Sequence, residues 1–104
     1  MFVRLQNRDN IVNLDSIAEV SITECETALN KRILKEYLDA GIQTIYRITL
    51  YSESGDGSFI AAGYIDRQGA EDALEALCDV LRDGRSYFEF SPDYKFMEVQ
   101  NERS

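Results

Sequence analysis

Hydrophobic and polar residues alternate in two short segments near the N-terminus, within residues 2–5 and 17–23, and a third short segment rich in apolar residues, 11–14, lies between them. A period of two is typical of β-strands with one buried face. Asn- and Asp-rich stretches at 7–10 and 13–16 separate the segments, and these residues favour turns. The pattern therefore predicts three short strands in an antiparallel meander.

The alternation stops at residues 25–40, where Leu, Lys, Glu and Ala are frequent and neither Gly nor Pro occurs. These residue types favour a helix. The pairs Ile33/Leu34 and Tyr37/Leu38, four residues apart, would give it an apolar side. We expect a helix over about 25–40. Because the apolar spacing of residues 24–32 is weak, the sequence does not decide whether that part is helical.

Two longer alternating segments follow, at residues 43–53 and 59–65. Between them stands Ser-Gly-Asp-Gly-Ser, and Asp-Gly readily adopts the positive φ angles of a hairpin turn. The return segment contains Ala61, Ala62 and Gly63, whose small side chains indicate that another element packs closely over the sheet. The region therefore predicts a β-hairpin.

The clearest helical pattern covers residues 67–83, with Asp66 as a candidate cap and Gly84 as its end. Apolar residues recur at spacings of three, four and seven and form one stripe. The stripe consists of Ala70, Ala73, Leu74, Leu77, Cys78 and Leu81. We expect this helix to pack across one sheet face, with Cys78 in the core.

The C-terminal part contains a short aromatic strand at 87–90, which Pro92 should end. Residues 94–99 are apolar enough for a final strand or turn, and residues 101–104 should fray. The prediction for 1–104 is a single α+β domain. Its antiparallel β-sheet has about five to six strands in meander or hairpin order, with two helices at about 25–40 and 67–83.

The charge balance narrows the range of partners that this domain could bind. Nineteen acidic residues face 11 basic ones, for a net charge of -8, and the eight Arg and three Lys are scattered. Nucleic acids and anionic membranes attract clustered basic residues, so we expect neither as a partner. With no signal peptide or membrane span recognisable, we expect a soluble cytoplasmic protein.

The chain is poor in catalytic side chains. It contains no His, and its two cysteines, Cys25 and Cys78, lie in unrelated segments with no zinc-type spacing. The glycine-rich stretch 54–58 precedes a strand rather than a helix, so it does not match a phosphate loop. We therefore predict no cofactor, no metal and no catalytic site. A small enzyme that depends on Cys25 or on carboxylates such as Glu24 and Glu26 is the weakest alternative.

Two surfaces remain as candidate interaction sites. The first is acidic: residues 66–83 contain six carboxylates and two Arg, a net charge of -4 and half of the chain's excess. The outward carboxylates proposed for binding are Glu71, Asp72, Glu75 and Asp79. The second is aromatic and either completes the core or forms a homodimer interface. It comprises Tyr87, Phe88, Phe90, Tyr94 and Phe96.

No residue motif points to a known family. The leading hypothesis is a non-catalytic module that binds another protein, and the acidity of the chain would suit a basic partner. The alternative is an inhibitor or immunity-type protein that imitates phosphates and blocks a basic enzyme acting on nucleic acid. The leading hypothesis rests on the acidity, the surplus of aromatic residues and the missing catalytic groups, and the alternative rests on the clustered carboxylates of residues 66–83.

Overall fold

A computed structural model describes residues 1–103 and contains six strands, three α-helices and two 3-10 turns. In chain order these are β1 (Phe2–Arg4), β2 (Ile11–Asn13), η1 (Leu14–Ser16), β3 (Ile17–Glu26), η2 (Thr27–Asn30), α1 (Lys35–Asp39), β4 (Thr44–Ser52), β5 (Ser58–Tyr64), α2 (Arg67–Arg82), β6 (Tyr87–Glu89) and α3 (Tyr94–Arg103). The α+β class predicted from the sequence is confirmed.

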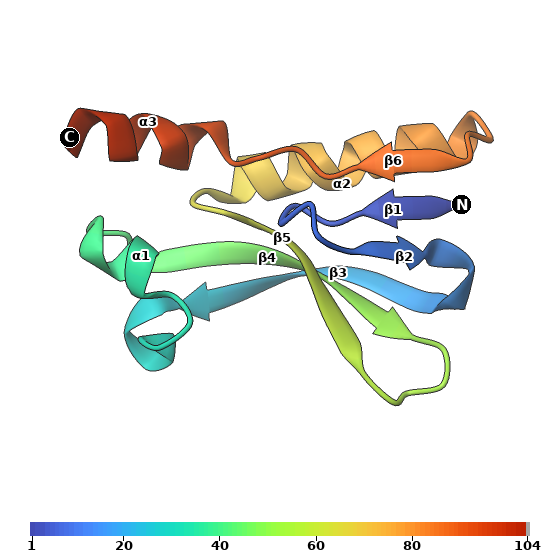
Figure 1. Cartoon of the computed structure of the whole chain (residues 1–104), viewed down its shortest axis with the longest axis horizontal. Coiled ribbons are helices and arrows are strands. Elements are labelled where there is room, and N and C mark those ends of the chain that lie inside the picture. Colours follow the sequence, from blue (N-terminus) through green and yellow to red (C-terminus); the bar gives the residue numbers. More distant parts are fainter. Residues whose placement is uncertain (104) are drawn as a thin grey trace.

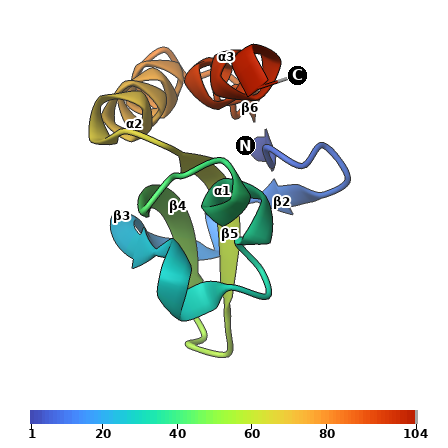
Figure 2. The same cartoon turned by 90° about the vertical axis from the view of Figure 1, so that its left-hand side faces the viewer.

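The strands divide between two three-stranded sheets (Figure 1). The first has the order β2-β1-β6, and β1 pairs in parallel with β6. The second has the order β3-β4-β5 and is antiparallel throughout. Helix α2 contacts β4 and β5, as expected. Figure 2 shows α2 and the first sheet on the same side of the second sheet.

The core lies between the β3-β4-β5 sheet and the layer above it. Val3 from β1, Ile48 and Leu50 from β4, and Ala70 and Leu77 from α2 are all almost completely buried there. The small residues Ala70 and Ala73 let α2 approach the sheet closely, as the Ala61-Ala62-Gly63 segment of β5 indicated. One face of each element therefore supplies the core.

The hairpin and the cap of α2 form at the predicted residues. Residues 53–57 form the turn between β4 and β5, but the positive φ, 75°, is at Gly55 and not at the Asp56-Gly57 pair to which the prediction assigned it. The carboxylate of Asp66 accepts a hydrogen bond from Gly69 N at 2.7 Å and so caps α2. In contrast, Cys78 is exposed, so its predicted place in the core is wrong. The stripe is wider than the contact with the sheet, and Cys78 lies beyond the buried row of Ala70, Ala73 and Leu77.

The predicted helix over 25–40 is wrong for most of its length. Strand β3 continues to Glu26, a 3-10 turn follows, and only Lys35–Asp39 is α-helical. The hydroxyl of buried Thr27 donates to Ile42 O at 2.6 Å, and Thr27 N donates to Gln43 O at 3.0 Å. Pairing with β4 therefore determines the conformation here, against the helix-favouring composition.

Two further differences concern strand partners and the C-terminus. β1 and β2 pair as predicted, but β3 pairs with β4 rather than completing a meander. The final strand or turn expected at 94–99 is wrong, because α3 begins at Tyr94. Asp93 Oδ1 accepts from Phe96 N at 3.4 Å in its first turn. Of the tail 101–104, residues up to Arg103 belong to α3, and Ser104 lies outside the described residues.

Among residues 1–103, no helix combines the length and the apolar character needed to cross a membrane.

Candidate functional site

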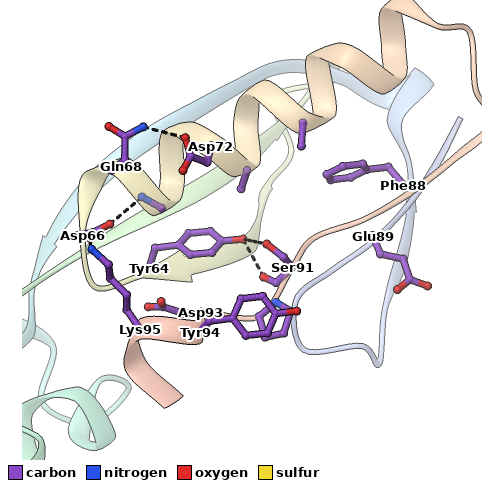
Figure 3. Close-up of a pocket in the computed structure, with 14 residues that line it drawn as sticks. Tyr64, Asp66, Gln68, Asp72, Phe88, Glu89, Ser91, Asp93, Tyr94 and Lys95 are labelled. Carbon is purple, nitrogen blue, oxygen red and sulfur yellow. Dashed lines mark hydrogen bonds and ion pairs between the residues drawn. The ribbon is translucent and has the colours of Figure 1, made fainter. Parts of the chain in front are cut away.

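A groove of about 350 Å³ lies between one side of α2 and the segment that links β6 to α3 (Figure 3). This volume falls at the lower end of the range for small binding pockets, about 300–1,000 Å³. The exposed surface of the groove is mostly apolar.

The α2 wall of the groove consists mainly of small residues. Gly69, Ala73 and Ala76 line it, together with Gln68 and Asp72. Their spacing places them on one side of the helix, adjacent to the row that packs on the sheet. A Cβ on Gly69 would lie 3.2 Å from Asp66 Oδ1 and 3.4 Å from the Tyr64 side chain, so this glycine leaves room for the capping carboxylate and for that ring. The small side chains leave the room that forms the groove.

The side chain of Tyr64 extends from the end of β5 across the groove to the opposite wall. Its hydroxyl donates to Ser91 O at 2.8 Å. Burial raises the pKa of Tyr64 above its ordinary value, and the hydrogen bond with Ser91 offsets part of that rise. Tyr64 is therefore a neutral donor at physiological pH and fixes the distance between the two walls.

Gln6 also holds the wall that the linker between β6 and α3 forms. Its Nε2 donates to Ser91 O at 3.0 Å and to Gly63 O at 3.1 Å, and its Oε1 accepts from Gly63 N at 2.9 Å. Its own backbone N–H donates to Ala61 O at 2.8 Å. One side chain after β1 thus joins the edge of β5 to the linker between β6 and α3.

Two aspartates connect the ends of the walls. Asp66 caps α2 and forms an ion pair with Lys95 of α3. The pKa of Asp66 is lowered, first by the hydrogen bond from Lys95 and then by that from Gly69 N. Asp93 Oδ2 accepts from Ile65 N at 2.7 Å, so its carboxylate ties α3 to the end of β5.

Negative charge exceeds positive charge around the groove. Asp66, Asp72 and Asp93 line it, and Lys95 is the one cation among the described side chains of its lining. Glu89 also borders the groove, but its side chain points away, and it forms an ion pair with Arg8 at 3.2 Å. The resulting combination is an apolar surface with an acidic surround.

The four carboxylates predicted on the outer face of the helix, Glu71, Asp72, Glu75 and Asp79, are all exposed. Three of them have partners within α2. Arg67 lies 3.1 Å from Glu71, Gln68 donates to Asp72 at 2.8 Å, and Arg82 lies 3.3 Å from Asp79. Only Asp72 also lines the groove.

The five predicted aromatic residues divide between core and surface. Phe90 and Phe96 are 2% and 7% exposed, and Phe96 stacks on Tyr37 with ring centroids 4.4 Å apart. Tyr87 and Tyr94 are 41% and 64% exposed, whereas Phe88 is half-buried. Phe88 and Tyr94 line the groove.

The structure therefore brings together one residue of the predicted acidic face and two of the predicted aromatic surface. Asp72 stands on one wall, and Phe88 and Tyr94 on the other. Sequence reasoning missed Tyr64 and Gln6, which hold the walls in place. Neither lies in a recognisable motif, because their roles depend on elements that are distant along the chain.

The remaining candidate reactive residues, the cysteines and possible metal ligands, do not form a site among the described residues. Cys25 is half-buried and Cys78 is exposed, and neither forms a disulfide. Within residues 1–103, no three Cys, Asp or Glu side chains gather as metal ligands.

Comparisons of the chain with family models, curated proteins and solved structures found no match.

Proposed function

We propose that this protein is a non-catalytic binding module whose groove holds a basic, partly apolar segment of another protein. The observation that carries the proposal is the pairing of an apolar groove with a surround in which carboxylates outnumber cations. Apolar anchors that enter a pocket supply much of the affinity of protein interfaces. Complementary charges at the rim favour the correct partner and its association rate.

The titration behaviour of the groove supports binding over catalysis. Asp66 has a pKa below its ordinary range because Lys95 and Gly69 N stabilise its anion. Glu89 does as well, mainly because of a hydrogen bond from Tyr87 and then one from Arg8. Acid–base catalysis by paired carboxylates usually requires one pKa to be raised. Asp66 and Glu89 instead remain anionic at neutral pH, and each is paired with a basic side chain, Asp66 with Lys95 and Glu89 with Arg8.

Panning random displayed peptides against the immobilised protein tests the proposal. We expect enrichment of sequences that combine Lys or Arg with Leu or aromatic residues. Ala76→Trp should abolish their binding, because Ala76 is exposed on the groove wall and an indole there would occupy the space. Ala28→Trp is the matched control, since Ala28 is exposed on η2 and does not line the groove.

Two results would count against this function. One is enrichment of peptides without basic residues, which would contradict the charge argument. The other is equal binding of the enriched peptides to wild-type protein and Ala76→Trp, which would move the binding site away from the groove.

The second candidate function is inhibition of a basic enzyme that acts on nucleic acid. It is favoured by the exposure of Glu71, Asp72, Glu75 and Asp79 along one helix. Ion pairs with Arg67 and Arg82 compensate part of this charge, so we place the inhibitor second. If the four carboxylates are changed to Lys and partner binding survives in low salt, the acidic face is not the docking surface.

We also propose that the protein works in the cytoplasm. The support is chemical: Cys25 and Cys78 are both free thiols, and unpaired cysteines are usual in reducing compartments.

A further inference from the structure

The outer edge of β3 is a second feature that the groove does not explain. β3 has ten residues and stands at the end of the sheet order β3-β4-β5, so only one of its edges is paired. Figure 2 shows it at the outer side of this sheet. Proteins commonly protect edge strands with Pro, Lys or irregularities, because an open edge pairs readily with another strand.

The register identifies which backbone groups are open. Thr27 N donates to Gln43 O at 3.0 Å on the β4 side, and hydrogen-bonded pairs alternate along an antiparallel ladder. Counting back in twos, the odd-numbered residues from Cys25 to Glu19 direct their backbone groups at β4. Val20, Ile22 and Glu24 therefore direct theirs outward. Among the described residues, no backbone group from outside the ladder bonds to these three.

Two features limit the length of this open stretch, one at each end. A register shift interrupts the ladder between Ile17 and Glu19. At the other end, Asn30 Nδ2 donates to Glu26 O at 3.1 Å and occupies that carbonyl. The open stretch from Val20 to Glu24 suits a short extended segment, comparable to an ordinary strand of about five residues.

The charge of the strand identifies its occupant. β3 contains Glu19, Glu24 and Glu26 and no Lys, Arg or Pro. Glu24 and Glu26 are exposed and, being two residues apart, lie on the same face of the sheet. Arg67 lies 3.6 Å from Glu24 but is shared with Glu71, so the local balance stays negative.

We propose that the β3 edge binds an extended basic segment of another protein by strand addition. Backbone bonds to Val20, Ile22 and Glu24 would hold the segment, as in other cases of strand addition. Lys or Arg at alternate positions would face Glu24 and Glu26. A second copy of β3 is disfavoured as the occupant, because it would bring three further carboxylates to the same edge.

The probe is a short blocked peptide that alternates Lys with Val, compared with one that alternates Glu with Val. We expect only the Lys peptide to bind. It should slow hydrogen exchange at the amides of Val20, Ile22 and Glu24 in the wild-type protein. Ala76→Trp should leave this binding unchanged, so failure here and failure of the groove are distinguishable.

The charge test is a double reversal, Glu24→Lys with Glu26→Lys, which should weaken binding at least about tenfold. The matched control is Glu53→Lys with Asp56→Lys, which makes the same change in net charge at exposed positions on the hairpin between β4 and β5. Equal losses in the two double variants would reduce the effect to net charge and overturn the proposal.

The backbone test is Glu24→Pro, which removes one outward N–H and should abolish binding, whereas Glu24→Gln should retain most of it. Three other results would overturn the proposal: no binding of the Lys peptide, equal binding of the Glu peptide, or a dimer of the free protein with these amides already protected. The last result would make a second copy the occupant.

Discussion

Removing the side chain of Gln6 should destabilise the protein far more than an ordinary polar substitution near the surface. Gln6→Ala deletes three hydrogen bonds, two to Gly63 and one to Ser91 O. Each such bond contributes about 0.5–1.5 kcal/mol net, and an unsatisfied buried donor costs more. Two of the three bonds are partly buried. The expected loss of unfolding free energy is therefore about 2–3 kcal/mol.

The measurement is equilibrium denaturation, together with thermal unfolding, where this loss corresponds to a fall in Tm of about 10–20 °C. Gln100→Ala is the matched control, because Gln100 is exposed and donates one hydrogen bond, to Glu36 at 2.6 Å. It should change stability by less than about 0.5 kcal/mol. The amide of Gly63 should also exchange faster in Gln6→Ala. Similar losses in the two variants would refute the bridging role of Gln6.

Three other predictions concern charge, thiols and self-association. Because the folded-state pKa of Asp66 is lowered, its contribution to stability is present above the ordinary carboxyl pKa of about 4 and is lost as the pH falls through the folded value. Asp66→Asn should therefore lower stability at pH 7 and flatten its loss in acid, as measured by urea denaturation; an unchanged acid profile would contradict this. In the native protein a thiol reagent should modify Cys78 before Cys25, and mass spectrometry of timed samples would reveal the opposite order. If the aromatic surface mediates self-association, sedimentation should detect dimers that Tyr94→Ser weakens, and a monomer at every concentration would exclude them.

The elements predicted correctly from the sequence are those with local causes. The hairpin turn within 54–58 requires only a few residues with suitable backbone freedom, although Gly55 and not the Asp56-Gly57 pair adopts the positive φ. Helix α2 has its cap at Asp66 and its buried row of Ala70, Ala73 and Leu77 within one continuous segment. Such signals need no information about distant parts of the chain.

The errors arose where distant contacts determine the structure. Residues 25 and 26 are strand because Cys25 and Glu26 pair with β4, whatever their helical propensity. The parallel pairing of β1 with β6 joins the two ends of the chain and has no local signal. For α3 a local signal did exist: Asp93 after Pro92 is a suitable helix start, but the apolar character of residues 94–99 was interpreted as a final strand or turn.

The candidate site was predicted in parts only. The sequence identified the acidic face with Asp72 and the aromatic segment with Phe88 and Tyr94. It could not show that these lie on facing walls, because the turn after α2 and the bonds of Tyr64 to Ser91 set that arrangement.

The most direct test of the groove as a binding site is a chemical-shift map. The ¹⁵N-labelled protein would be titrated with a basic, apolar peptide selected by panning. We predict the largest changes at Tyr64, Asp72, Ala76 and Tyr94, on the two walls and at the crossing between them. Changes of equal size spread over the whole surface, or centred on residues outside the groove, would contradict the proposed function.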